Sequence, residues 1–317
     1  MRDPGKPAVR HVYRNAIMNS ERWNGFRPRN DDIVIATSYK AGTTWLQGIC
    51  ACLVFQEPEP PVPQDELTPW LDANFSGPIE EVLAQVDALT NRRYIKTHLP
   101  LDGLPYFEQV KYVFVGRDGR DVFMSLWNHW NNLSPEFRAA LNDAPDRVGD
   151  PFPPPPDDIN AAFDDWLSRS TFEWERDGYP FWSHLSHAQS WWDYRHLDNL
   201  LHVHFADLLA DLDGEMRRIA AFLDIPVDEK IWPTLVNAVR FESMRANAGK
   251  MAPGATKGAW KDTANFFHKG TNRRWESVLR PEQIRRYERV AAERLDPALA
   301  RWLEHGRRVA GDPKSGR

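Results

Sequence analysis

Four short segments carry side chains that could hold an anion or accept a proton. The first, Thr37–Trp45 (TSYKAGTTW), contains a lysine, a glycine and a pair of threonines. The second, Lys96–His98 (KTH), places an ammonium group close to an imidazole. The third is Arg117–Ser125 (RDGRDVFMS) and the fourth is Phe266–Gly270 (FFHKG). These residue types indicate chemistry on a charged anion, with histidine as a proton acceptor because its pKa lies near 6.5.

The Thr37–Trp45 segment suits a phosphate or sulfate better than a metal–triphosphate complex. Backbone N–H groups at the start of a helix, together with a lysine, form a cradle for an anion. A regular P-loop has a glycine, four residues, then glycine, lysine and a serine or threonine that holds Mg²⁺. Here Lys40 precedes Gly42, the first glycine is missing, and Ala41 follows the lysine. The loop therefore disfavours one alternative, a P-loop kinase, and we expect no metal.

The elements around these segments predict an α/β fold. Short apolar segments predict strands, and longer amphipathic segments predict helices. The predicted strands are Asp31–Thr37, Arg93–Thr97, Lys111–Gly116 and Leu200–Phe205, and the predicted helices include Trp45–Phe55, Pro78–Leu89, Asp121–Trp130, Asp158–Arg169 and Ser183–His196. Such alternation indicates a central parallel sheet flanked by helices, of the P-loop nucleotide-binding type. Ligands of such sheets bind outside the carboxyl ends of the strands, where the first three chemical segments lie.

We expect one domain over residues 1–317, with three parts. A nucleotide-binding core covers about residues 30–275, and a helical C-terminus covers about residues 276–306. Residues 131–190 are expected to form a lid or acceptor region. Within them, Leu133–Pro156 ends in DPFPPPP and lacks clear periodicity, which predicts a mobile excursion.

Composition limits the partners and the compartment. The net charge of −5 argues against nucleic-acid binding, and the 14 tryptophans predict an aromatic cavity. Cys50 and Cys52 lie in an apolar segment, which predicts buried free thiols in a reducing compartment. The N-terminal segment lacks the apolar stretch of a signal peptide, and no window reaches the length of a membrane span. We therefore expect a cytoplasmic protein, for which a homodimer stays possible.

Taken in order, the four segments resemble the cytosolic type of sulfotransferase that depends on 3′-phosphoadenosine 5′-phosphosulfate (PAPS). The family's 5′-phosphosulfate loop reads roughly Tyr-Pro-Lys-Ser-Gly-Thr-Thr-Trp and matches here from Lys40 to Trp45, except at Ala41. Lys96–His98 resembles its Lys-Thr-His segment. Arg117 and Ser125 resemble its 3′-phosphate residues, and Phe266–Gly270 its C-terminal loop. The resemblance covers residues 32 to 275 and implies PAPS as co-substrate and PAP (3′-phosphoadenosine 5′-phosphate) as product.

The resemblance also implies catalytic roles. Sulfuryl transfer is an in-line displacement, so positioning and electrostatic stabilisation should dominate it, as in phosphoryl transfer. Lys40 would stabilise the bridging oxygen of the leaving nucleotide, and Lys96 would hold the sulfuryl oxygens. His98 would be the general base that takes the proton of the acceptor hydroxyl.

Binding residues follow from the same resemblance. The expected nucleotide-binding residues are Lys40, Ala41, Gly42, Thr43, Thr44, Trp45, Arg117, Ser125, Phe241, His268, Lys269 and Gly270. The acceptor is expected to be a small, hydrophobic or aromatic molecule with a hydroxyl group. Its pocket should draw on Trp70, Leu71, Phe75, Trp127, Trp130 and residues 133–192.

The sequence departs from the family pattern near the phosphate loop and in the C-terminal loop. Ser38-Tyr39 replaces Tyr-Pro, and Ala41 replaces a serine that helps restrain the catalytic lysine. His268 stands where arginine is common, and Arg273 where a second glycine is common. A non-catalytic PAP-binding protein is a further alternative, which the intact Lys40, Lys96 and His98 disfavour.

Overall fold

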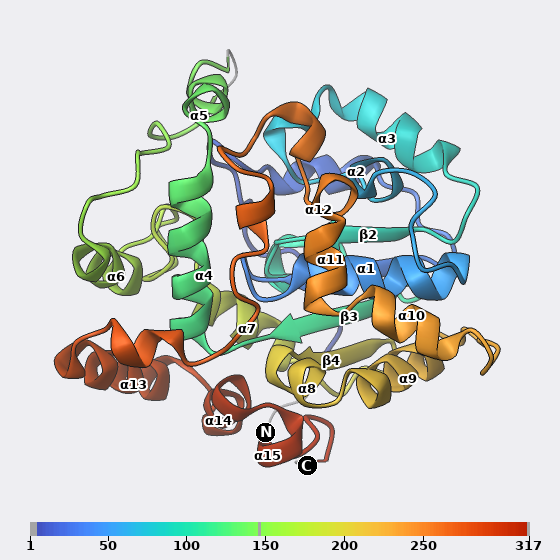
Figure 1. The fold of residues 1–317 in the computed structure, drawn as a ribbon. Coiled ribbons are helices and arrows are strands. Elements are labelled where there is room, and N and C mark those ends of the chain that lie inside the picture. The colour runs from blue at the N-terminus through green and yellow to red at the C-terminus, as the bar shows by residue number, and fades with distance from the viewer. Residues whose placement is uncertain (1–4, 145–146, 316–317) are drawn as a thin grey trace.

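The fold is built on one parallel sheet, as the computed structural model shows for residues 5–144 and 147–315. Its four strands are β1 (Ile33–Thr37), β2 (Tyr94–Thr97), β3 (Lys111–Gly116) and β4 (Leu200–His204), in the spatial order β2-β1-β3-β4. All neighbouring pairs are parallel. The expected single α/β domain with a central parallel sheet flanked by helices is confirmed (Figure 1).

Helices cover both faces of this sheet (Figure 1). In chain order the α-helices are α1 (Thr43–Phe55), α2 (Gln64–Leu67), α3 (Ile79–Ala88), α4 (Gly119–Asn132), α5 (Pro135–Asn142), α6 (Ile159–Ser168), α7 (His184–Trp192), α8 (Phe205–Ala210), α9 (Leu212–Phe222), α10 (Trp232–Ala238), α11 (Phe241–Ala246), α12 (Ala248–Met251), α13 (Pro281–Arg294), α14 (Pro297–His305) and α15 (Arg307–Ala310). None of the helices within the described residues is long and apolar enough to cross a bilayer.

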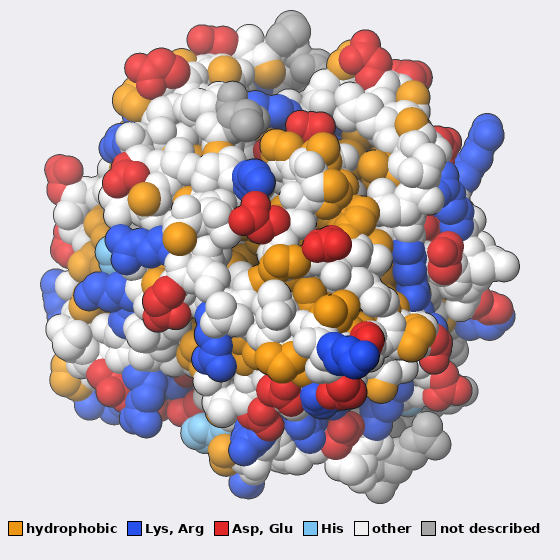
Figure 2. Space-filling model, turned by 45° about the vertical axis from the view of Figure 1, so that its right-hand side comes forward, with side chains coloured by type: hydrophobic (Ala, Val, Ile, Leu, Met, Phe, Trp, Pro, Cys, Tyr) orange, Lys and Arg blue, Asp and Glu red, His pale blue; other side chains and the backbone are white. Residues whose placement is uncertain are grey.

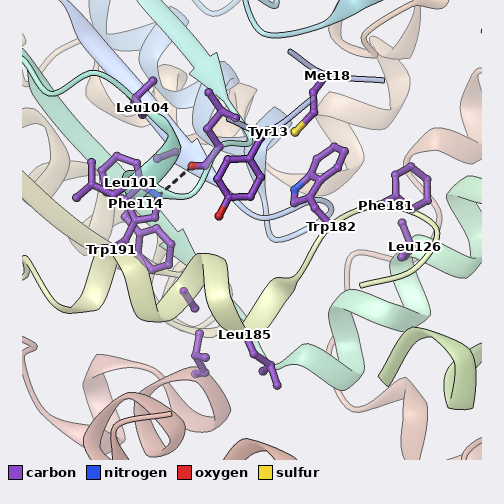
Figure 3. Packing of buried hydrophobic residues seen from close by; sticks show 14 of the residues in the cluster. Tyr13, Met18, Leu101, Leu104, Phe114, Leu126, Phe181, Trp182, Leu185 and Trp191 are labelled. Atoms are coloured by element: carbon purple, nitrogen blue, oxygen red, sulfur yellow. Dashed lines mark hydrogen bonds between the residues drawn. The ribbon is translucent and has the colours of Figure 1, made fainter. Parts of the chain in front are cut away.

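Alternate residues of the strands divide the core into two hydrophobic clusters, because successive side chains of a strand point to opposite faces. Ile33, Ile35 and Val113 pack with α1, α9 and α10 on one face. Val34 and Phe114 pack on the other face with α4, α6, α7 and α14. Figure 3 shows this second cluster, in which the Trp191 indole donates a hydrogen bond of 3.2 Å to the Leu99 carbonyl. The two clusters therefore hold the sheet from both faces and support the loops at the carboxyl ends of its strands.

Several element boundaries differ from the predicted ones by one to four residues. The first long helix begins at Thr43 rather than Trp45, and Phe205 starts α8 instead of ending β4. The larger error is α5, which lies inside the segment expected to be an irregular excursion. Ser134 caps this helix and Pro135 occupies its first turn, which is a helix-start signal that the sequence carries. Residues 145–146 of the same segment lie outside the described residues.

An ion pair at the amino ends of β1 and β2 supports the register between these two strands. Arg93 donates to both carboxylate oxygens of Asp32 at 2.7 and 2.5 Å, and both side chains are fully buried. The backbone of the same two residues continues the ladder, since Ile33 N–H donates to the Arg93 carbonyl at 2.9 Å. Ala36 is thereby paired with Thr97, which brings the residues after β1 and β2 together.

Both cysteines are buried and free, as predicted. Burial raises the pKa of the Cys50 and Cys52 thiols to about 12. On the surface, Figure 2 shows Lys and Arg side chains interspersed with Asp and Glu around a band of hydrophobic side chains. This face therefore carries no broad basic area.

We predict that the buried ion pair is needed for stability. Arg93→Met should lower the free energy of unfolding by about 3–5 kcal/mol, because it leaves the Asp32 carboxylate buried without its partner. Urea unfolding followed by circular dichroism measures the change. Arg217→Met is the matched control, since Arg217 binds Glu229 with two hydrogen bonds of 2.6 and 2.8 Å at the exposed surface. The control should barely move the midpoint, and an equal loss in both variants would contradict the prediction.

Candidate active site

The carboxyl ends of β1, β2 and β3 open into a cavity of about 260 Å³ that the C-terminal loop closes on one side. Among the residues that line it are most of the predicted site residues: Lys40, Gly42, Thr43, Thr44, Trp45, Lys96, His98, Arg117, Ser125, Phe241, His268, Lys269 and Gly270. The structure thus brings together side chains that the sequence separates by more than 200 positions.

The loop between β1 and α1 has the backbone of an anion site. Gly42 is the N-cap of α1, with φ of 134° and no side-chain cap, so the first N–H groups of the helix are left for another acceptor. A Cβ at Gly42 would come within 3.3 Å of Phe205 and Val115, in addition to its unfavourable φ. Lys40 also has a positive φ, 67°, which is strained for a residue with a side chain. Thr43 and Thr44 both line the cavity, and the Thr43 hydroxyl also forms a hydrogen bond of 2.6 Å with the Thr37 hydroxyl.

Ala41 is the predicted loop residue that does not line the cavity. Its side chain is fully buried, and its N–H donates to the Ser38 carbonyl at 3.3 Å. The residue after Lys40 therefore packs into the core of the loop. The family pattern gives the order of residues along a loop but not the direction of each side chain, so a nucleotide contact of Ala41 stays a prediction.

Two lysines face the cavity in surroundings that disfavour their charge. Burial and the positive charge of Arg117 lower the pKa of Lys40 to about 7. Burial also lowers the pKa of Lys96, and the negative charges of Asp65 and Asp72 partly offset this decrease. Neither lysine forms a salt bridge within the described part of the chain. An anion in the cavity would stabilise the charged form of both side chains.

His98 follows β2 and is held in one tautomer. Its Nδ1 lies 2.9 Å from the Thr37 carbonyl oxygen, which can only accept, so Nδ1 carries the proton and Nε2 the lone pair. The Asp72 carboxylate fixes the same turn by accepting from the His98 backbone N–H at 3.3 Å. Burial, followed by the charge of Lys96, lowers the pKa of His98 to about 3, so the ring is neutral at pH 7.

Arg117 connects β3 to the loops on both sides of it. Its guanidinium donates to the carbonyl oxygens of Lys40 at 3.3 Å and Thr271 at 3.0 Å, and to the Asn272 side chain at 3.2 Å. It also lies 3.8 Å above the Phe205 ring. Burial lowers the pKa of Arg117 to about 10. Ser125, on α4, lines the same part of the structure as a half-buried hydroxyl.

Arg274 is a cavity residue that the sequence analysis missed. It follows Arg273, whose φ of 64° explains why glycine would be favoured there. The backbone N–H groups of both residues donate to Asp121 on α4 at 3.0 and 3.3 Å, which ties the C-terminal loop to that helix. The Arg274 guanidinium is half-buried, forms no hydrogen bond or salt bridge among the described residues, and lowers the pKa of Arg117 by its charge. Its position four residues beyond the Phe266–Gly270 motif gave the sequence no signal for this role.

Aromatic rings stand beside these cations. Trp45 donates from its indole to the Val239 carbonyl at 2.9 Å and meets the Phe205 ring edge-on at 5.1 Å. Phe241 packs directly on Gly270, where a Cβ would lie 2.3 Å from the ring. Trp45 and Phe241 are both half-buried and line the cavity. They could therefore accept a flat ring system.

The other end of the cavity is mainly aromatic. Trp70 and Phe75 line it as predicted, and Leu133 and Phe137 do so from the segment that contains α5. Leu71, Trp127 and Trp130 do not line it, so these acceptor residues were predicted wrongly. Leu71 and Trp130 are buried in the hydrophobic core, where the Trp130 indole donates to the Pro153 carbonyl at 3.0 Å. A sequence pattern identifies apolar positions but does not show which of them pack in the core and which line a cavity.

Tyr39, His129 and Trp260 are further lining residues without a sequence prediction. His129 lies 2.7 Å from the Tyr39 hydroxyl and 3.3 Å from the Lys40 ammonium group. Elsewhere, the pairs His184/His187 and His202/His204 are buried in the protein interior. Across residues 5–144 and 147–315, no group of three or more His, Cys, Asp or Glu side chains could hold a metal ion.

Solved structures resemble this fold. Mouse sulfotransferase SULT7A1 complexed with PAP superimposes with a TM-score of 0.66 and 22% identity, over 89% of this chain and 90% of its own. Retinol dehydratase in a complex with retinol and PAP gives a TM-score of 0.68, with 22% identity, over 87% of this chain and 84% of its own.

Sequence comparisons give the family. A "Glycolipid sulfotransferase" of Mycobacterium bovis (strain BCG / Pasteur 1173P2) is 33% identical over 314 residues, which cover 94% of this chain and 95% of the relative. "Sulfotransferase 1B1" of Mus musculus is 28% identical over 73% of this chain and 71% of its own length. The family model of the sulfotransferase domain matches residues 30–298. This chain therefore belongs to the sulfotransferase family.

Proposed function

We propose that this protein transfers the sulfuryl group of PAPS to a hydroxyl group of a largely apolar acceptor and releases PAP. The observation that supports the proposal best is the set of cations around one cavity: Lys40, Lys96, Arg117 and Arg274 line it without a salt bridge within the described residues. Such a set favours a ligand with several negative charges. Membership of the sulfotransferase family argues against the P-loop kinase alternative.

The proposed reaction forms a bond between sulfur and the acceptor oxygen and breaks the bond between sulfur and the 5′-phosphate oxygen. Lys40 would donate to the oxygen of the breaking bond, and Lys96 to the sulfuryl oxygens. His98 would take the hydroxyl proton on Nε2, the ring nitrogen that its bond to Thr37 leaves unprotonated. The negative charge of the bound nucleotide would raise the low pKa of His98, because neighbouring lysine charges help to lower it.

The nucleotide would be held by both sides of the cavity. The N-terminus of α1 is suited to the 5′-phosphosulfate, and Trp45 and Phe241 to the adenine ring. Arg117, Ser125 and Lys269 are proposed for the 3′-phosphate, as the sequence motif implies. Arg274 is added to this set because its positive charge lowers the pKa of Arg117, which places the two guanidinium groups near each other.

The acceptor would occupy the aromatic end, with residues 131–190 contributing Leu133 and Phe137 to its walls. An apolar alcohol or phenol fits Trp70 and Phe75. A glycolipid is a second candidate, favoured by the mycobacterial relative and by Asp65, Gln85 and Asn128, which add polar groups to the same cavity.

The first prediction tests the activity. PAPS incubated with the protein should release PAP and form a sulfated product when a phenol, a sterol-like alcohol or a glycolipid is present. Free glucose should be a poor acceptor, because it cannot use the aromatic walls. Product is followed by mass spectrometry and PAP by chromatography. The absence of a sulfated product from every acceptor, with PAP still bound tightly, would favour a non-catalytic PAP-binding protein.

The second prediction concerns the base. His98→Ala should lower kcat about 10²–10⁴-fold, the usual contribution of a general acid–base group. PAP affinity should barely change, because the proposed nucleotide contacts do not include this ring. Isothermal titration with PAP serves as the folding control. If turnover with a weakly acidic alcohol stays within a few-fold of the wild type, another group is the base.

The third prediction concerns the 3′-phosphate. Arg274→Ala should weaken PAP binding by about 1.5–3 kcal/mol, the contribution of a hydrogen bond to a charged group, and leave 5′-AMP binding unchanged. Arg273→Ala is the matched control, since it removes an equal charge from the neighbouring side chain, which binds Glu276 instead. Arg117→Ala should show the same preference for PAP over 5′-AMP. Equal losses for both nucleotides would assign these arginines a structural role.

A further inference from the structure

His129 lies between the phosphate loop and the aromatic end of the cavity. It is one helical turn after Ser125 on α4, so both side chains face the same way. The residue is 7% exposed and lines the cavity. Both ring nitrogens have protein partners, since Nδ1 lies 3.3 Å from the Lys40 ammonium group and Nε2 lies 2.7 Å from the Tyr39 hydroxyl.

The partners determine where the proton of His129 lies. A charged lysine can only donate, so Nδ1 must accept from Lys40. The ring is neutral, because burial and then the charge of Lys40 lower the pKa of His129 well below its usual value. Nε2 therefore carries the proton and donates to the Tyr39 oxygen. The tautomer is opposite to that of His98, whose Nδ1 donates to the Thr37 carbonyl.

The two histidines consequently differ in what they can do. His98 keeps a lone pair on Nε2 that no described residue uses. The only lone pair of His129 is directed at Lys40, so this ring is not a second base. Trp260 and Phe266, from the C-terminal loop, pack against the His129 ring at centroid distances of 4.7 and 6.1 Å, which fixes its orientation.

Lys40 needs such an acceptor. Its backbone is strained, with φ of 67°, and the next residue, Ala41, has no hydroxyl to offer. No carboxylate among the described residues binds its ammonium group. Among the described residues, His129 Nδ1 is the only hydrogen-bond partner of the ammonium group, which also lies 4.2 Å from the centroid of the Phe266 ring.

We propose that His129, oriented by Tyr39, is a positioning residue that holds the Lys40 ammonium group charged and directed into the cavity. The inference rests on the proposed function, because the position of Lys40 matters for the oxygen of the breaking bond. Under this proposal α4 supplies both Ser125 for the nucleotide and His129 for the position of Lys40.

The test uses variants that separate the two hydrogen bonds. His129→Phe keeps a ring for Trp260 and Phe266 but removes both bonds. His129→Asn keeps an oxygen near the position of Nδ1 and so retains an acceptor for Lys40. Tyr39→Phe removes only the hydroxyl that orients the imidazole.

His129→Phe should lower kcat about 10–100-fold with KM changed only a few-fold, the size of effect that a small misplacement of a catalytic group produces. His129→Asn should recover most of the loss, and Tyr39→Phe should lie between. PAP affinity is also measured from pH 5.5 to 9 in each variant. In the wild type it should fall as pH rises through the pKa of Lys40, about 7, since only the charged lysine attracts the anion. In His129→Phe the fall should begin at lower pH, and in His129→Asn at the wild-type pH.

Lys40→Met is the reference for these curves, because any pH dependence that remains in it comes from PAP itself. If His129→Phe and His129→Asn have the same kcat and the wild-type pH midpoint, the ring only fills space and the inference is wrong. If no acceptor is sulfated by the wild type, the proposed function fails. The pH midpoints would still decide whether His129 holds the charge of Lys40.

Discussion

The structure depends on keeping positive charges next to one another in a cavity that is largely withdrawn from water. Burial lowers the pKa of Lys40 to about 7, that of Arg117 to about 10, and that of Lys96 below its usual value. Without an anion these groups oppose folding, since each charge loses hydration and meets like charges. The remaining scaffold has to compensate, and the two hydrophobic clusters and the buried Asp32–Arg93 pair stabilise the sheet beneath the cavity.

Close to these positive charges, the ends of β1 and β3 are connected by a neutral side chain, that of His184. His184 Nε2 donates to the Arg117 carbonyl at 3.1 Å, so its Nδ1 accepts from the Ser38 hydroxyl at 2.6 Å. This one side chain links the ends of β1 and β3 without adding a charge. Its own helix, α7, is held by Asp177, which accepts from the His184 backbone N–H at 3.1 Å.

Sequence patterns predicted the elements with a regular spacing of apolar residues and the site residues that belong to a recognisable motif. The β-branched strands and the order of the chemical segments gave the parallel sheet and most of the cavity lining, Lys40, Lys96, His98 and Arg117 included. They failed where tertiary packing decides. Trp130 joins the core, and Arg274 reaches the cavity because the backbone of the C-terminal segment is bound to Asp121 on α4. By contrast, α5 was predictable, since Ser134-Pro135 is an ordinary helix start.

The two buried cysteines have a practical consequence for labelling. A thiol with a pKa of about 12 and no access to water is almost entirely protonated at neutral pH, so maleimides and oxidants find little thiolate to attack. A cysteine introduced at Glu136, on the exposed side of α5, would then be the only reactive thiol of the folded chain. A fluorophore attached there would sit one residue from Phe137 and report on the cavity wall without any change to the native cysteines.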